Sequence, residues 1–158
     1  MPLLEGVRVV ALDFRGHGLS QHGDSYGYAD YQRDVTWLLD RLKLDDVTVA
    51  GHSLGGYVAL LAARRSDRIG RVLAIDVKSD WTEEDAAFAE RSRDATQRVE
   101  HVRCRAEVLA GSESEVMPLD SARRFAEALP GATVEVIDGA GHHVELDAPE
   151  LVAERILG

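Results

Sequence analysis

The chain has 158 residues, of which 45% are hydrophobic and 29% charged, and its formal net charge at pH 7 is −10. This length and composition are typical of one globular domain with a core of its own. Because so acidic a surface repels phosphate backbones and anionic lipids, we expect neither a nucleic-acid partner nor a membrane partner. The sequence contains no run that resembles a membrane span or a secretory leader, so we expect a cytoplasmic protein.

Strand patterns and helix patterns alternate along the chain. In chain order we predict a strand at 7–12, a helix at 31–42, a strand at 47–50, a small-residue helix reaching 62–64, a strand at 72–75, a charged helix over about 82–102, a strand at 106–110, a helix at 119–129 closed by Pro130, a strand at 133–137 and a short helix from about Pro149. This alternation predicts an α/β fold, with a mainly parallel sheet and helices on both faces. We expect residues 1–158 to form a single domain with a short helical excursion at about 77–104.

A Gly-x-Ser-x-Gly motif, Gly51-His52-Ser53-Leu54-Gly55, lies between the strand at 47–50 and the helix that follows. In a strand-turn-helix context this motif forms a tight turn that exposes the serine hydroxyl, and we expect Gly51 and Gly55 to lack bulk for that reason. The N-terminus of the helix supplies N–H groups and partial positive charge suited to an oxyanion. We therefore predict Ser53 as a nucleophile. The alternative is a structural turn in which Ser53 caps the helix.

A serine hydroxyl needs a neighbouring general base, and in this order of elements the histidine follows the last strand. The glycine-containing segment 139–143 lies there, and we predict His142 as the base and His143 as a packing or supporting residue. The histidine spacing predicts no metal site. The other histidines show no spacing typical of metal ligands; they are His17, His22, His52 and His101.

Three motifs in order resemble those of the α/β-hydrolase superfamily, in its branch of small serine esterases and haloperoxidase-like enzymes. The segment 12–20 resembles the Asp-x-Arg-Gly-x-Gly-x-Ser loop, the segment 51–56 resembles the nucleophile elbow, and Gly141-His142 resembles the terminal histidine loop. The resemblance implies hydrolysis through an acyl-serine without a cofactor, with the backbone N–H of Leu54 at the oxyanion. Epoxide hydrolases and haloalkane dehalogenases of this superfamily use an aspartate as nucleophile, so the serine argues against both.

The acidic member of the expected catalytic triad stays open at this point. The family's usual acid position, three residues after the glycine that ends the penultimate strand, is occupied by Ser114. Asp76 ends the strand after the elbow helix, where some relatives supply the acid, and we favour it. Glu115, one residue beyond the usual position, and Glu113 are the alternatives.

The resemblance also implies strands ahead of residue 7 and a loop that donates a second oxyanion N–H, and residues 1–6 supply neither. In the family's sheet such a strand lies between 7–12 and 47–50, which makes this chain a truncated α/β-hydrolase fold. We expect those two segments to pair directly or to leave an exposed edge, and hence a homodimer or a rearranged sheet.

The short connection after the strand at 72–75 predicts an open site without a large cap. Trp81 and Phe88 in this connection are candidate walls of an acyl site, or plain core residues. We assign His52 and Trp81 to substrate binding. The expected ligand is a small-molecule ester.

These patterns predict a serine carboxylesterase that cleaves short or medium acyl esters. A lactonase, a C–C hydrolase or a perhydrolase could use the same residues. The other class left open is a non-catalytic hydrolase-fold protein that binds a ligand or partner.

Overall fold

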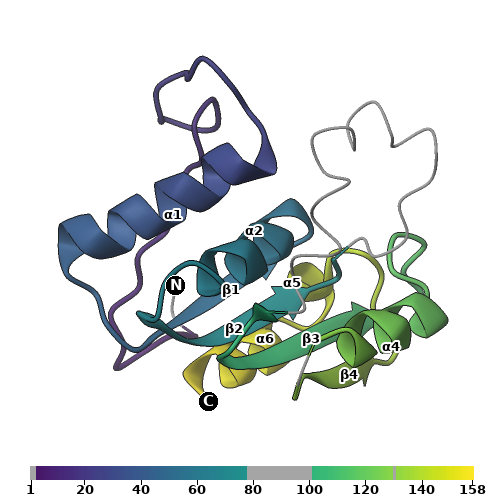
Figure 1. Ribbon diagram of the computed structural model, residues 1–158. Coiled ribbons are helices and arrows are strands. Elements are labelled where there is room, and N and C mark those ends of the chain that lie inside the picture. Colours follow the sequence, from purple (N-terminus) through teal and green to yellow (C-terminus); the bar gives the residue numbers. More distant parts are fainter. Residues whose placement is uncertain (1–2, 78–100, 130) are drawn as a thin grey trace.

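The computed structural model describes residues 3–77, 101–129 and 131–158, and over these ranges a four-stranded sheet forms the centre of the protein (Figure 1). The strand order is β1-β2-β3-β4, and each neighbouring pair is parallel. The strands are β1 (Val47–His52), β2 (Ile69–Ile75), β3 (Arg105–Gly111) and β4 (Thr133–Ile137). The helices are α1 (Tyr28–Leu42), α2 (Leu54–Ala63), α4 (Leu119–Glu127), α5 (Val144–Asp147) and α6 (Pro149–Leu157).

Helices cover both faces of this sheet, as Figure 1 shows for α2 and α4 on one side and α6 on the other. Successive residues of a strand point to opposite faces, so β2 and β3 each supply two core clusters. Val72 and Val108 belong to the cluster that includes residues of α1, α2 and α4. Leu73 and Leu109 belong to the cluster closed by residues of α5 and α6. The predicted α/β fold with a parallel sheet is therefore confirmed.

The predicted helices and strands from residue 31 onward agree with the structure wherever it describes them, except that α5 was not expected. Four residues are too few for the apolar spacing that predicts a helix. The predicted helix over 82–102 and the helical excursion at 77–104 fall almost entirely on 78–100, outside the described residues, as do Trp81 and Phe88.

The strand predicted at 7–12 is wrong, since this run has no strand structure. Its side chains stay partly exposed, with 48% for Val7 and 37% for Leu12. A strand needs a hydrogen-bonding neighbour, and within the described ranges β1 pairs only with β2. The run therefore does not pair directly with β1, and the outer edge of β1 carries no described strand. A homodimer through this edge stays a prediction.

The loop with the Asp-x-Arg-Gly-x-Gly-x-Ser motif is anchored to α1. Arg15 donates from Nε to Oδ2 of Asp34 at 2.8 Å and from its terminal nitrogen to Oδ1 at 2.5 Å. The ring of Phe14 packs against Tyr31, with 4.9 Å between the ring centroids. A two-point arginine–carboxylate pair fixes orientation as well as distance. This motif therefore holds the first loop against the helix that follows it.

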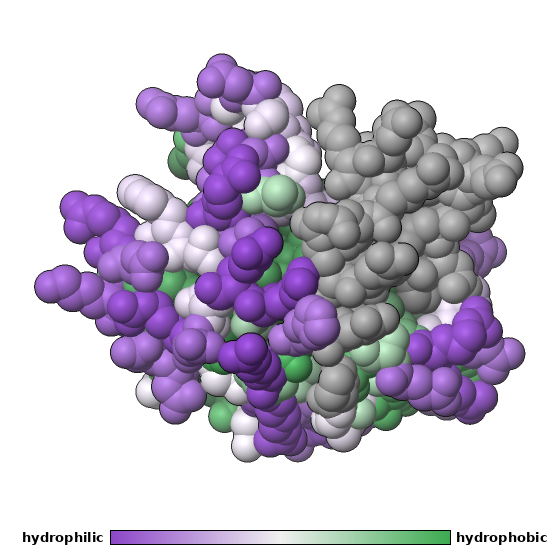
Figure 2. Space-filling view, in the orientation of Figure 1, coloured by the Kyte–Doolittle hydropathy of each residue, from purple (hydrophilic) through white to green (hydrophobic). Residues whose placement is uncertain are grey.

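The face of the molecule in Figure 2 is mainly hydrophilic, with hydrophobic residues visible between the polar ones. This pattern agrees with the high content of charged residues. No helix among the described residues combines the length and the apolar character needed to cross a membrane.

Candidate active site

Ser53 occupies a sharp turn between β1 and α2. Its backbone has φ of 50° and ψ of −116°, in a region that residues other than glycine rarely adopt. The Ser53 backbone N–H donates to the carbonyl of Ile75 at 2.8 Å, which ties the turn to the end of β2. Because α2 begins at Leu54, the backbone N–H of Leu54 lies in the first helical turn and has no carbonyl acceptor within the helix.

Close backbone packing explains why residue 51 of the motif is a glycine, but it does not explain Gly55. A Cβ atom on Gly51 would lie 2.3 Å from the carbonyl carbon of Gly55, which no real structure tolerates. A Cβ atom on Gly56 would lie 2.6 Å from the carbonyl oxygen of Gly51. On Gly55, however, an added Cβ would meet no described atom within 4 Å. The expectation that Gly55 must lack bulk is wrong, because its backbone, and not its side-chain position, faces Gly51.

His142 and Asp76 are in direct contact. Nδ1 of His142 lies 2.5 Å from Oδ2 of Asp76. Asp76 directly follows the last residue of β2. Its side chain is fully buried, whereas the side chain of His142 is 27% exposed. A carboxylate can only accept a hydrogen bond, so Nδ1 carries the ring proton and Nε2 keeps its lone pair. The contact therefore leaves Nε2 as the basic atom of the ring.

Among the described residues, two further groups donate hydrogen bonds to the carboxylate of Asp76. The backbone N–H of Gly111 donates to Oδ1 at 3.1 Å, and the hydroxyl of Ser114 donates to Oδ2 at 2.6 Å. Ser114 Oγ also accepts the backbone N–H groups of Val116 and Met117, each at 3.2 Å, so its own hydrogen is left for Asp76. Together with Nδ1 of His142, three donors among the described residues thus satisfy a buried carboxylate that would be costly to bury without partners. The sequence analysis noted only that Ser114 occupies the family's usual acid position, and it missed this supporting role. The feature that could have indicated the role is a side-chain hydroxyl at that position.

The alternative acids lie elsewhere. Glu113 and Glu115 are both exposed, and neither contacts His142 in the part of the chain that the structure describes. Among the described residues, Asp76 is the carboxylate that reaches the imidazole of His142.

The loop that carries His142 packs directly on the end of β3. A Cβ atom on Gly111 would lie 2.2 Å from the carbonyl oxygen of Gly141, so only glycine allows the loop to come this close. The backbone N–H of Glu113 donates to the carbonyl of Ala140 at 2.9 Å, and that of Gly139 donates to Ser112 Oγ at 2.8 Å. These contacts fix the backbone on the N-terminal side of His142.

His52 connects the nucleophile turn with the histidine loop. Its Nε2 lies 2.8 Å from the carbonyl oxygen of His142, and the two ring centroids are 4.4 Å apart. Burial lowers the pKa of His52, which favours its neutral form. His142 therefore lies beside the residue that precedes Ser53. Among the described contacts, the side chains of Ser53 and His142 do not share a hydrogen bond.

A parallel α/β sheet with a serine turn after one strand, an aspartate after the next and a histidine after the last defines an α/β-hydrolase fold. Residues 1–99 match the sequence model of the alpha/beta hydrolase fold family, and the chain belongs to this family.

Relatives with this fold include several hydrolases. The chain is 29% identical over 131 residues to the sn-1-specific diacylglycerol lipase ABHD11 of Xenopus laevis, which is 82% of this chain and 38% of the relative. It is 36% identical over 76 residues to Esterase YbfF of Escherichia coli, which is 48% of this chain and 30% of the relative. The chain thus spans well under two thirds of either protein. Among solved structures, a mutant of the meta-cleavage product hydrolase CumD shares the fold with a TM-score of 0.82 at 18% identity, over 99% of this chain and 81% of that one.

Proposed function

We propose that this chain is a serine hydrolase that cleaves carboxylic esters with short or medium acyl chains. The observation that carries the proposal is the hydrogen bond between buried Asp76 and His142, formed next to the strained turn at Ser53. It leaves a basic Nε2 on His142, whose backbone carbonyl contacts His52, the residue before Ser53 at the C-terminal edge of the sheet. Nucleophile, base and orienting acid follow the arrangement that activates a serine hydroxyl.

In the proposed reaction, Ser53 Oγ attacks the ester carbonyl carbon while Nε2 of His142 takes the hydroxyl proton. The charged imidazole is stabilised by the carboxylate of Asp76, and the backbone N–H of Leu54 donates to the oxyanion. The tetrahedral intermediate then collapses, and His142 returns the proton to the leaving alcohol. Water, deprotonated by the same nitrogen, attacks the acyl-serine, and His142 returns this proton to Ser53 Oγ as the bond to the acyl group breaks and the carboxylic acid leaves. Neither a metal ion nor an organic cofactor takes part in these steps.

The alternative function is ligand binding without catalysis. The observation in its favour is that the described residues give Ser53 no hydrogen bond to His142. In enzymes without substrate, however, such bonds are often long and tighten only when substrate binds. We therefore place the hydrolase first. The lactonase, C–C hydrolase and perhydrolase reactions use the same three side chains and differ in substrate alone.

Hydrolysis of p-nitrophenyl acetate by the purified chain tests the proposal. We expect turnover above the uncatalysed rate, and its loss in Ser53→Ala. Ser66→Ala is the matched control, because Ser66 lies between the end of α2 and the start of β2, away from the site, and should keep its activity. Equal rates for the wild type and Ser53→Ala would contradict the proposal. Linear esters of increasing acyl length and a lactone then define the substrate.

A further inference from the structure

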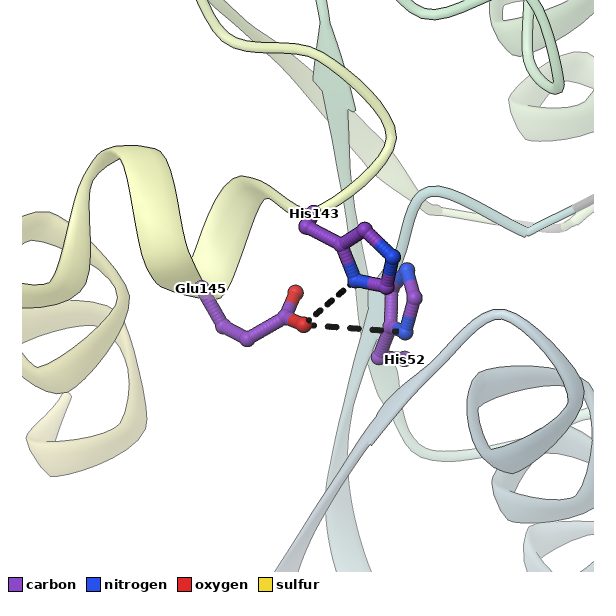
Figure 3. Close-up of side chains that lie close together, drawn as sticks. All are labelled: His52, His143 and Glu145. Carbon is purple, nitrogen blue, oxygen red and sulfur yellow. Dashed lines mark hydrogen bonds and ion pairs between the residues drawn. The ribbon is translucent and has the colours of Figure 1, made fainter.

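Three groups that can ligate a metal ion converge beside His142 (Figure 3). His52 ends β1, His143 directly precedes α5, and Glu145 lies on α5. One ligand atom from each lies within 4.8 Å of the others. Oε1 of Glu145 is 3.1 Å from Nδ1 of His143 and 3.8 Å from Nδ1 of His52. Figure 3 shows the carboxylate pointing toward both rings. Because the chain separates His52 widely from the other two, the sequence spacing did not reveal this cluster.

The orientation of His52 suits a metal ligand. The carbonyl oxygen of His142 can only accept, so Nε2 of His52 carries the ring proton and donates it over 2.8 Å. Nδ1 of His52 then keeps its lone pair on the side of Glu145. Histidines that bind metal ions almost always donate their other N–H to a carbonyl or a carboxylate, which fixes the ring. This second contact is already in place.

Glu145 supplies an independent observation. Its Oε2 atom is buried and has no hydrogen-bond partner in the part of the chain that the structure describes. A buried carboxylate oxygen without a partner is costly, and a cation bound by both oxygens of Glu145 satisfies it. His143, by contrast, is 59% exposed, so an ion can enter and keep bound water on that side.

The donor set indicates which ion fits. Two imidazoles and one carboxylate are ligands of zinc and of similar transition-metal ions, with a remaining position for water. Calcium and magnesium prefer sites built of several oxygen donors, and this cluster supplies only the one carboxylate of Glu145. The net charge of −10 also raises the concentration of cations near the protein.

We propose that His52, His143 and Glu145 form a binding site for a divalent transition-metal ion such as Zn²⁺. This metal site does not depend on the proposed function.

Zinc titration of the chelator-treated 158-residue chain by calorimetry tests the site. We expect one ion per chain with a dissociation constant on the order of micromolar, and binding weakened at least about tenfold in His143→Ala. His143 is exposed, so this variant should fold. His22→Ala is the matched control, since its ring bonds to Tyr26 instead, and it should bind zinc as the wild type does. Absent binding in the wild type, or equal weakening in both variants, would overturn the site.

Cobalt gives a second readout. Co²⁺ in the site should show the visible absorption bands of nitrogen and oxygen ligation in the wild type and lose them in His143→Ala. The same bands in both proteins would overturn the assignment of His143 as a ligand.

Discussion

The carboxylate of Asp76 lies 2.5 Å from Nδ1 of His142, although the two residues are 66 positions apart. Asp76 directly follows β2, and His142 lies in the loop after β4. The end of β3 lies between them, where Gly111 donates to Asp76 and makes room for the histidine loop. A parallel sheet brings the C-terminal ends of its strands to one edge, and here that edge assembles the base with its acid.

Replacement of Asp76 tests which carboxylate orients the base. Asp76→Asn should lower kcat for ester hydrolysis by about 10²–10⁴-fold, because an amide neither fixes the correct tautomer of His142 nor stabilises the charged ring. Glu115→Gln is the control: Glu115 is exposed and makes no described contact with His142, so kcat should stay unchanged. Steady-state kinetics of both variants decide the matter. A larger loss in Glu115→Gln would transfer the role to Glu115.

Removal of the Ser114 hydroxyl should weaken the hydrogen bonding that holds the carboxylate of Asp76 in position against His142. Ser114→Ala deletes the 2.6 Å hydrogen bond to Oδ2, and bonds to charged groups are worth about 1.5–3 kcal/mol. Part of that energy supports catalysis, so we expect kcat to fall about tenfold with little change in KM, since Ser114 is buried. A thermal melt checks that the variant is folded. An effect on KM with an unchanged kcat would contradict this role.

The two glycines of the elbow should respond in opposite ways to alanine. Gly51→Ala places a methyl group against the backbone of Gly55 and should cost about 1–3 kcal/mol of unfolding free energy together with most of the activity. Gly55→Ala meets no described atom and should be neutral or slightly stabilising, because alanine favours a helix over glycine by up to about 1 kcal/mol. Chemical denaturation measures both. Equal destabilisation would contradict the packing at this turn.

The ion pair between α6 and β4 should make stability depend on pH. Hydrogen bonds from Arg155 hold the pKa of Glu135 below its ordinary value of 4.5. The unfolded chain binds this proton more readily, so the stabilisation is present above about pH 4.5 and is lost as the pH falls through the lower folded pKa.

The measurement is the melting temperature between about pH 7 and about pH 3.5. Glu135→Gln should show a smaller drop over this range than the wild type, whereas the exposed Glu150→Gln should behave as the wild type does. The difference is small because the pair is partly exposed to solvent. A drop of the same size in all three proteins would show that the pair of Glu135 and Arg155 does not contribute to the pH dependence of stability.

Much of the fold could be predicted from local patterns. β2 and β3 are buried on both faces, so their apolar runs stand out, and α1 shows its apolar face by spacing alone. The run at 7–12 has the same apolar character but no described neighbour to pair with, and pairing is a property of the sheet that local sequence does not contain. The four residues of α5 carry too little pattern to be recognised.

The candidate site, like the fold, could be predicted from the sequence only in part. Ser53 and His142 lie in motifs with defined spacing, and the resemblance to relatives that supply the acid after the corresponding strand favoured Asp76 over Glu115. The partners of Ser114 and the convergence of His52 with Glu145 depend on distances between loops, which neither composition nor spacing contains. The tight glycine could not be identified either, because Gly55 and Gly56 are adjacent and only the backbone geometry shows which one is crowded.

The most direct measurement is the reaction of the folded chain with a fluorophosphonate, followed by peptide mapping with mass spectrometry. This probe modifies a serine only where a neighbouring base activates it. We predict one adduct per chain on Ser53, slower labelling in His142→Gln, and none in Ser53→Ala. A folded chain whose Ser53 stays unmodified, or one that is labelled equally after Ser53→Ala, would contradict the assignment of this serine as the nucleophile.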